Sequence, residues 1–287
     1  MKTKTRPRNK GYVRDKNNFN EGVKLWASYY RCNIHRFCID YFGLNLFPFQ
    51  MMVLYMMNKS TIAMTIASRG IGKSYLLAIF CCAKAVLLPQ SKIILASGTK
   101  GQSKLLISQK IEKELMVASP NLRREISSIQ VGQNMALVKF RNGLTIEAVA
   151  STDNSRGYRG TILVLDESRL ISKHVLDSVL RPFLTVTRQP KFMTKKEYKD
   201  YPREENSELY ISSAWYKDHY MYDKFLSIVK GMCKGKSMFA CNFSYLLAMN
   251  HGLLTPNRVE NMRTEEDFDD ITWSMEMEGL FYGKFFA

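Results

Sequence analysis

The sequence is short of acidic residues. It contains 26 Asp and Glu against 42 Lys and Arg, so its formal net charge is +16. Simple solubility seldom requires so much charge of one sign. A basic excess of this size favours polyanionic partners, although it does not define a fold. The composition therefore points to nucleic acid as a partner.

The sequence also lacks paired cysteines and a long apolar run. Its six cysteines include no Cys-x-x-Cys pair, which suits a reducing compartment better than a disulfide framework. No apolar segment follows the basic N-terminus, so no signal peptide is evident. The longest apolar stretch, residues 74–88, is shorter than the ~20 residues that span a bilayer, and it contains Lys84. We therefore expect a soluble protein without a membrane partner, and an apolar fraction of 46% is ample for a core.

A glycine-rich turn stands between two apolar segments. It reads ASRGIGKS from Ala67 to Ser74, after a predicted buried strand over 61–67 and before a predicted helix over 74–88. In such a turn the backbone curls around phosphates, and the N–H groups of the following helix point at them. Lys73 would reach the β- and γ-phosphates and Ser74 would ligate Mg²⁺. The usual pattern begins with glycine where this sequence has Ala67, so a chance match is the alternative interpretation.

A second apolar run ends in two carboxylates, Asp166 and Glu167. Because Asp166 ends a strand too apolar to face water, its carboxylate needs a partner, and Mg²⁺ is the natural one. Glu167 could then polarise an attacking water. The alternative is that the two residues merely begin a surface loop. Taken together, the two motifs supply what phosphoryl transfer requires, and they predict Mg²⁺-dependent hydrolysis of ATP.

Strands and helices alternate after residue 60. The expected strands cover 61–67, 92–97, 135–140, 144–149, 162–165 and 209–213, and the expected helices cover 74–88, 101–117 and 174–184. The segments 135–140 and 144–149 should form a hairpin. This alternation predicts an α/β fold of the P-loop NTPase type, with a mostly parallel central sheet flanked by helices, a small C-terminal lid, and the site at the carboxyl ends of the strands.

Composition also suggests a division of the chain into parts. We expect a basic mobile tail over residues 1–20, a helical subdomain over 21–45, an ATPase core over 46–254 and a lid or linker over 255–287. Thr264 and the acidic residues after it resemble the beginning of a helix. The polar stretch 188–207 should be a loop or insertion.

In this order, the motifs resemble the ATPase domain of the large terminase subunit of tailed bacteriophages, the motor that packages DNA into procapsids. The resemblance covers roughly residues 40–287. An arginine inside the phosphate loop is characteristic of terminases, and Arg69 occupies that place. The other matching residues are Pro48-Phe49-Gln50 as the adenine motif, Ser68, Gly70, Gly72, Lys73 and Ser74 in the phosphate loop, Asp166-Glu167 as the magnesium and water-activating pair, and Ser212-Ser213-Ala214 as the coupling motif.

The resemblance implies roles for these residues. Arg69 and Glu167 would be catalytic, Gln50 would read the adenine edge, Ser212 and Ser213 would sense the γ-phosphate, and ATP and Mg²⁺ would be the cofactors. A further catalytic arginine would reach into a neighbouring subunit, and Arg156 fits its spacing best, with Arg159 as the second choice. The alternatives are that both arginines only bind DNA or shape their loop, and that the two serines only cap a strand end.

The resemblance also implies partners: double-stranded DNA, the portal and procapsid, the small terminase subunit, and other copies of the chain in a ring, all in the host cytoplasm. Large terminases usually continue into a nuclease domain. The acidic residues within 265–270 lie in an expected charged helix without a strand to present them, so we expect no DNA cleavage by this chain. Two other functions stay open, namely a helicase-like DNA-dependent ATPase and a non-catalytic DNA-binding protein that holds nucleotide.

Overall fold

The computed structural model describes residues 16–133, 135–196, 200 and 203–283. At its centre lies an eight-stranded sheet with the strand order β3-β4-β5-β2-β6-β7-β1-β8. The six neighbouring strands β5-β2-β6-β7-β1-β8 are all parallel, and β4 is antiparallel to both β3 and β5. The strands are β1 (Ile62–Ala67), β2 (Lys92–Ser97), β3 (Ile126–Val131), β4 (Ala136–Phe140), β5 (Thr145–Ala150), β6 (Ile162–Asp166), β7 (Ser207–Ser212) and β8 (Met238–Phe243).

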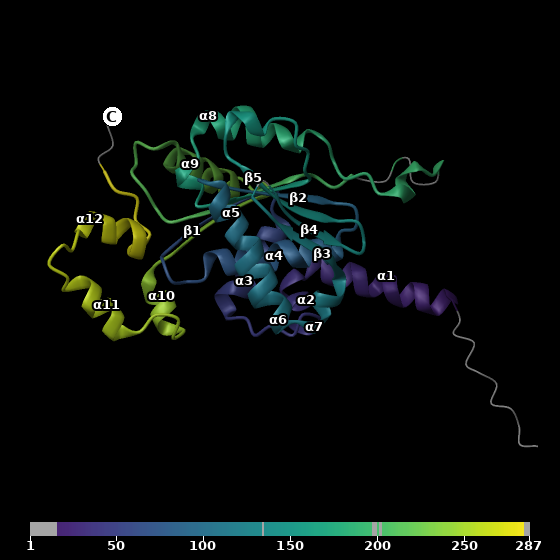
Figure 1. The fold of residues 1–287 in the computed structure, drawn as a ribbon, viewed down its shortest axis with the longest axis horizontal. Helices are drawn as coiled ribbons and strands as arrows, with labels where there is room; N and C mark the ends of the chain where they lie inside the picture. The colour runs from purple at the N-terminus through teal and green to yellow at the C-terminus, as the bar shows by residue number, and fades with distance from the viewer. Residues whose placement is uncertain (1–15, 134, 197–199, 201–202, 284–287) are drawn as a thin grey trace, which may run out of the picture.

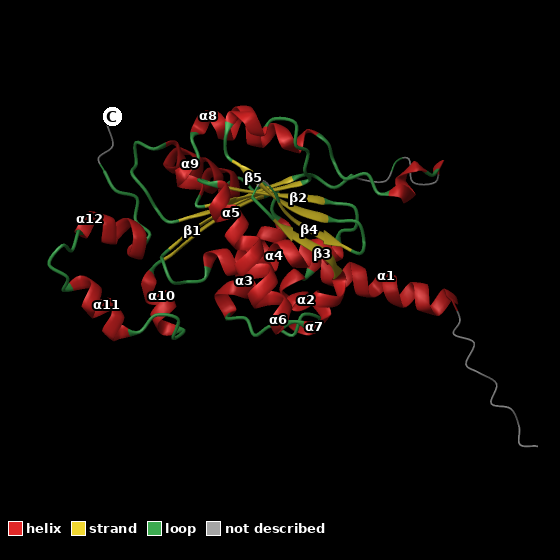
Figure 2. Ribbon diagram, viewed as in Figure 1, coloured by secondary structure: helices red, strands yellow, loops and turns green. Residues whose placement is uncertain are grey.

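Helices cover both faces of this sheet (Figure 2). One face carries α2 (Ile34–Asp40), α3 (Pro48–Lys59), α4 (Lys73–Leu87) and a long helical stretch made of α5 (Lys100–Leu105), a π-helix (Leu106–Leu115) and α6 (Met116–Ala118), followed by α7 (Pro120–Glu125). The other face carries α8 (Lys173–Val175), a π-helix (Leu176–Leu180), a 3-10 helix (Arg181–Thr185) and α9 (Tyr220–Cys233).

The central strands are buried on both faces, because their side chains point alternately into two hydrophobic cores, one on each face of the sheet. In β2, Ile93 and Leu95 pack under α4, whereas Ile94 and Ala96 pack under the helices of the opposite face. The same alternation holds in β6, where all five residues are buried. Such strands read as continuous apolar runs, as parallel strands covered on both sides do.

Two parts of the chain extend from this body (Figure 1). Helix α1 (Lys16–Cys32) projects on one side. On the other side lies the C-terminal segment, residues 244–283, which contains α10 (Tyr245–Asn250), α11 (Pro256–Arg263), α12 (Asp270–Trp273) and a π-helix (Ser274–Glu278). Short 3-10 helices lie at Asp153–Ser155, Ser168–Leu170 and Lys191–Thr194. Within the described part of the chain, no helix combines the length and apolarity that a membrane crossing demands.

The predicted α/β fold with a mostly parallel sheet is confirmed, and so is the hairpin, since β4 and β5 pair in antiparallel fashion around residues 141–143. Among the described elements, strands β3 and β8 and helices α7, α9, α10 and α11 were not predicted. Residues 16–20, expected to belong to a tail, form the first turns of α1, and residues 1–15 lie outside the described residues. The division of the chain at residues 45 and 254 stays a prediction.

The prediction for Thr264 was wrong. Thr264 is the C-cap of α11, where its backbone N–H and its hydroxyl both meet the carbonyl oxygens of Glu260 and Asn261. The next helix, α12, is capped instead by Asp269, whose carboxylate accepts hydrogen bonds from the N–H groups of Ile271 and Thr272. The residues between them form a turn. The acidic side chains here therefore follow one helix and cap another, which the local composition could not distinguish.

Candidate nucleotide site

The turn between β1 and α4 is shaped by two glycines. Gly70 and Gly72 have φ values of +80° and +88°, a left-handed conformation that strains other residues. The second of them is the N-cap of α4, so the helix begins at Lys73 with its first N–H groups directed toward the turn. The sequence pattern of residues 67–74 thus forms the expected strand, turn and helix, which is a ready anion-binding geometry.

Lys73 lies at the centre of this turn. Its amine donates to the carbonyl oxygens of Ala67 and Ser68 at 3.0 and 3.1 Å and to the Ser213 hydroxyl at 3.2 Å. Burial lowers the pKa of Lys73, and the nearby negative charge of Glu167 opposes that change. Because Ser213 directly follows β7, the amine connects the glycine-rich turn to the end of a neighbouring strand. The structure therefore brings together Lys73 and the predicted coupling motif.

Ser74, in the first turn of α4, faces Asp166, the last residue of β6. The Ser74 hydroxyl donates to Asp166 Oδ2 at 3.1 Å, and the N–H of Glu167 donates to the other carboxylate oxygen at 3.1 Å. Asp166 is only 9% exposed, and burial together with the charge of Glu167 raises the pKa of its carboxyl to about 6. Two oxygen ligands next to each other on an octahedral Mg²⁺ are about 2.9 Å apart, so this pair fits the ion.

Several buried polar atoms at the site have no hydrogen-bond partner among the described residues. They are Ser68 Oγ, Arg169 Nη1, and the pair Arg169 Nε and Glu167 Oε2, which lie 3.6 Å apart, too far for a hydrogen bond. Buried polar groups are normally satisfied, and a cluster of orphans calls for a missing polar partner. A cavity of about 430 Å³ adjoins Ser74, Asp166 and Glu167. The residues present therefore fit a phosphate-bearing ligand with its metal ion.

A charged network joins this site to the C-terminal segment. The Glu276 carboxylate accepts hydrogen bonds from Arg69 at 2.9 and 3.3 Å and pairs with Arg169 at 2.5 Å. Arg169 also lies 3.6 Å from Glu167 Oε2, and its guanidinium stacks on the Trp215 ring at 4.4 Å. Although burial alone would raise it, the pKa of Glu276 falls to about 2, because Arg69, Arg169 and Ser213 favour the ionised form.

The backbone of Glu167 adopts an unfavourable conformation. Its φ of +45° lies in the left-handed region, which a glutamate seldom adopts. One of its oxygens lies 3.9 Å from the Lys73 amine. Such conformations persist where the surrounding structure fixes them, and they cluster at functional sites. The carboxylate is thus held beside the lysine rather than directed into solvent.

The structure places Gln50 beside the turn but uses part of its side chain. Gln50 is buried near the start of α3, and its neighbour Phe49 packs against Ala67 and Ile71. However, Gln50 Oε1 accepts a hydrogen bond from the Phe47 N–H at 3.0 Å. The amide oxygen therefore stabilises the first turn of α3, which leaves the NH₂ group as the part that can recognise a base.

Ser212 lies with the site, whereas the two loop arginines do not. The Ser212 hydroxyl is buried and accepts a hydrogen bond from the Arg169 N–H at 3.4 Å. Arg156 is 65% exposed and lies 3.7 Å from the carboxylate of Asp153, and Arg159 bonds the carbonyl oxygen of its neighbour Tyr158. Neither arginine contacts the glycine-rich turn among the described residues. Their side chains point to the surface, as a contact with another subunit would require.

Sequence reasoning missed Arg169, Trp215 and Glu276. Arg169 follows the two carboxylates closely and could have been noticed as a cation beside them. Trp215 directly follows Ala214 of the predicted coupling motif, but a single aromatic residue carries no signal. Glu276 lies 207 residues after Arg69, and nothing in the sequence links the two.

Comparison with known proteins agrees with a nucleotide site at this position. The model of one protein family, "Terminase large subunit, T4likevirus-type, N-terminal", matches residues 64–227, more than half of the chain. None of the curated protein sequences compared with the chain matches it.

Solved structures share the fold at low sequence identity. The large terminase ATPase domain of Thermus phage P74-26 has a TM-score of 0.59 at 14% identity, with 85% of this chain and 97% of that chain covered. The large terminase of a thermophilic bacteriophage gives 0.62 at 12% identity, with 83% and 54% covered, and that protein has also been solved in complex with ADP. The HK97 bacteriophage large terminase gives 0.50 at 13% identity, with 83% and 44% covered. The chain thus spans about half the length of these two large terminases.

Proposed function

The chain belongs to the large terminase subunits of the T4likevirus type, whose N-terminal part it matches, and on this premise we propose that it is the ATP-hydrolysing motor that moves double-stranded DNA into a viral procapsid. The observation that supports this most directly is the meeting of Lys73, Ser74, Asp166 and Glu167 at the carboxyl edge of the sheet, beside orphaned polar atoms. Ligands of open α/β sheets bind at this edge.

Each of these side chains would contribute one interaction. Ser74 and Asp166 would hold Mg²⁺, which neutralises charge on the phosphates and polarises them. Lys73, already directed into the turn, would contact the β- and γ-phosphates. Glu167 would orient the attacking water and accept its proton. Ser213, which touches the Lys73 amine, would register whether the terminal phosphate is present.

Two arginines would complete the reaction centre. Arg69 stands in the turn and would meet charge that develops on the transferred phosphoryl group. Arg156 would reach the same group from a neighbouring copy of the chain, since among the described residues its ion pair is with Asp153 and not with the turn of its own chain; Arg159 is the second choice. An arginine of this kind contributes ~10³–10⁵ in rate in related chemistry. The site would therefore be complete only in an assembled ring.

The proposed partners follow from the family and the charge. The net charge of +16 suits double-stranded DNA held mainly through its phosphates, as a motor that accepts any sequence requires. The portal, the procapsid and the small terminase subunit would be the protein partners, in the host cytoplasm.

The test is ATP hydrolysis by the purified chain across a range of protein concentrations, with and without double-stranded DNA. We expect turnover per chain to rise steeply with concentration. Glu167→Ala should lower turnover at least about 100-fold while nucleotide binding persists, since general-base groups contribute ~10²–10⁴. Glu112→Ala, on an exposed position of the π-helix, is the matched control and should leave turnover unchanged.

Other outcomes would contradict parts of the proposal. Turnover that is independent of concentration but stimulated by DNA would favour a helicase-like ATPase. Nucleotide binding that gives no turnover in any assembly, with Glu167→Ala indistinguishable from the parent, would favour a non-catalytic DNA-binding protein.

Mixing experiments test the arginine. Arg156→Ala and Lys73→Ala should each be inactive alone, whereas a mixture of the two should recover turnover, because some interfaces then combine an intact turn with an intact arginine. Arg159→Ala serves as the comparison. Recovery by Arg159→Ala in the same mixture, with Arg156→Ala fully active, would transfer the role to Arg159.

A further inference from the structure

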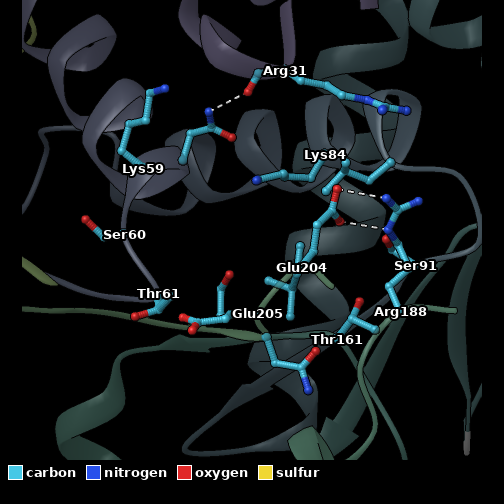
Figure 3. Close-up of a pocket in the computed structure, with 15 residues that line it drawn as sticks. Arg31, Lys59, Ser60, Thr61, Lys84, Ser91, Thr161, Arg188, Glu204 and Glu205 are labelled. Carbon is cyan, nitrogen blue, oxygen red and sulfur yellow. Dashed lines mark hydrogen bonds and ion pairs between the residues drawn. The ribbon is translucent and has the colours of Figure 1, made fainter. Parts of the chain in front are cut away.

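A second polar cavity lies at the opposite edge of the sheet from the glycine-rich turn. It has a volume of about 250 Å³ and is formed where β6 and β7 begin, beside the ends of α3 and α4 (Figure 3). The glycine-rich turn, by contrast, follows the carboxyl end of β1. The two sites are therefore separated by the length of the strands, and this cavity is no part of the proposed reaction centre.

Basic side chains converge on this cavity from separate elements. Its lining includes four basic residues, Arg31, Lys59, Lys84 and Arg188, and two acidic ones, Glu204 and Glu205, a difference of 4 − 2 = +2. Arg188 is neutralised by Glu204 through two hydrogen bonds of 2.8 Å. Arg31 donates to the carbonyl oxygen of Leu87. After the Arg188–Glu204 pair, three cations (Arg31, Lys59 and Lys84) and one carboxylate (Glu205) remain in the lining, so the cavity keeps its positive excess.

Neither lysine has a carboxylate partner among the described residues. The contact found for the Lys84 amine is the Phe80 ring at 5.6 Å, and that for the Lys59 amine is the Tyr55 ring at 5.7 Å. Figure 3 shows the Lys84 side chain pointing into the open space between Lys59 and Glu204. Burial lowers the pKa of Lys84 to about 8, although Glu204 acts in the opposite direction. An ammonium group taken out of water without an anion is costly.

We propose that this cavity binds a phosphate group, with the amines of Lys84 and Lys59 as its ligands. Two ammonium groups that form no ion pair among the described residues, beside an open space, supply the charge and the donors that a phosphate dianion needs. Pockets for drug-sized ligands measure ~300–1,000 Å³, so this smaller cavity suits the phosphate itself rather than a whole nucleotide. The phosphate could come from solution or from the backbone of DNA, and the chemistry of recognition is the same.

The proposal does not depend on ATP hydrolysis, so its test reads the cavity alone. The full chain is treated briefly with an amine-methylating reagent at pH 8, and the labelling rate of each lysine is measured by peptide mass spectrometry. If a bound phosphate raises the pKa of Lys84 by one unit, its free-amine fraction at pH 8 falls from about one half to about one tenth, so its rate falls about fivefold. Lys113, exposed on the π-helix, is the internal control.

Three additions separate the sources of phosphate. They are inorganic phosphate, sodium chloride at equal ionic strength, and a DNA duplex at equal phosphate concentration. Protection of Lys84 by inorganic phosphate but not by DNA identifies a free-anion site, and protection by DNA identifies a contact with its backbone. Equal rates in phosphate and chloride, with no protection by DNA, would overturn the proposal.

Two variants check that the protection arises in the cavity. In Lys84→Met, phosphate should no longer protect Lys59, and in Lys59→Met the protection of Lys84 should weaken, while thermal unfolding confirms that both variants fold. Lys59 protection that survives in Lys84→Met would place the anion elsewhere and would also overturn the proposal.

Discussion

Glu276 binds Arg69, the side chain that the proposed function assigns to the transferred phosphoryl group. It also binds Arg169, receives a hydrogen bond from Ser213, and, like Glu167, opposes the lowering of the Lys73 pKa that burial causes. A nucleotide would bring a second anion to the same cations. We therefore expect Glu276→Gln, which keeps the shape of the side chain and removes its charge, to strengthen nucleotide binding while it weakens the fold.

The size of both effects follows from the structure. The surroundings lower the pKa of Glu276 from the ordinary 4.5 to about 2, which corresponds to about 3 kcal/mol in favour of the ionised form. Arg69 is 67% exposed, so its share is reduced by solvent to about 1 kcal/mol or less. Buried Arg169 and the Ser213 hydroxyl supply the rest. Release of Arg69 alone would therefore tighten nucleotide binding about fivefold.

The stability effect has a definite pH window. A carboxylate whose pKa is lowered in the folded state stabilises the fold above its unfolded pKa, here 4.5, and loses that contribution as the pH falls toward 2. At pH 7, Glu276→Gln should lower the free energy of unfolding by about 1–3 kcal/mol. The difference from the parent should shrink from pH 4.5 downward.

The assay combines titration with a fluorescent ADP analogue and chemical denaturation of the nucleotide-free protein. Glu278→Gln is the matched control, because Glu278 lies in the same π-helix and, within the described part of the chain, its side chain accepts a hydrogen bond from Ser274 alone. Unchanged or weaker nucleotide binding in a folded Glu276→Gln protein would refute the competition between Glu276 and phosphate. Loss of stability without a gain in affinity would leave Glu276 as a structural residue only.

Three further predictions concern single positions. Gly279→Ala should destabilise the fold by more than about 2 kcal/mol in chemical denaturation, because at a φ of +75° the added Cβ would lie 2.3 Å from Asn242 Oδ1. The control is Gly252→Ala, which has a φ of +68° and open space around it and should cost only ~1 kcal/mol. Equal costs for the two variants would contradict the predicted clash. Lys84→Met should raise the free energy of unfolding at pH 7 by about 1–3 kcal/mol, because burial of the charged lysine destabilises the folded state. This gain should disappear between pH 8, the pKa of Lys84 in the folded protein, and pH 10.5, its ordinary pKa, as the lysine loses its charge. Ser74→Ala should abolish the increase in ADP affinity that Mg²⁺ produces in the parent, and a persisting increase would exclude Ser74 as a metal ligand.

The parts of the site that sequence predicted are those encoded by neighbouring residues. The turn at residues 67–74 requires glycine at positive φ, and the apolar run before Asp166 can only be a buried strand, so both motifs carry their geometry with them. The juxtaposition of Ser74 and Asp166 then follows from the rule that parallel strands present their carboxyl ends at one edge.

The parts that sequence did not predict depend on distant packing. Strand β8 lies at the edge of the sheet, where only two of its six residues are buried, so its apolar pattern is weak. The π-helices have the same apolar spacing as ordinary helices over one or two turns. Gln50 is a different case, because a Gln at the third position of a helix that begins with Pro48 is a known helix-start signal, and it explains where the amide oxygen goes.

The position of β1 in the sheet has a consequence for how the protein forms. Strand β1 carries the glycine-rich turn, yet its two neighbours are β7 and β8. The first residue of β7 is synthesised 207 − 62 = 145 residues after that of β1, which takes about 7–30 s at ordinary translation rates. During that interval the nascent β1 lacks both of its native neighbours, and its apolar residues stay available to chaperones or to other unfinished chains. Pairing at such sequence separation also slows folding.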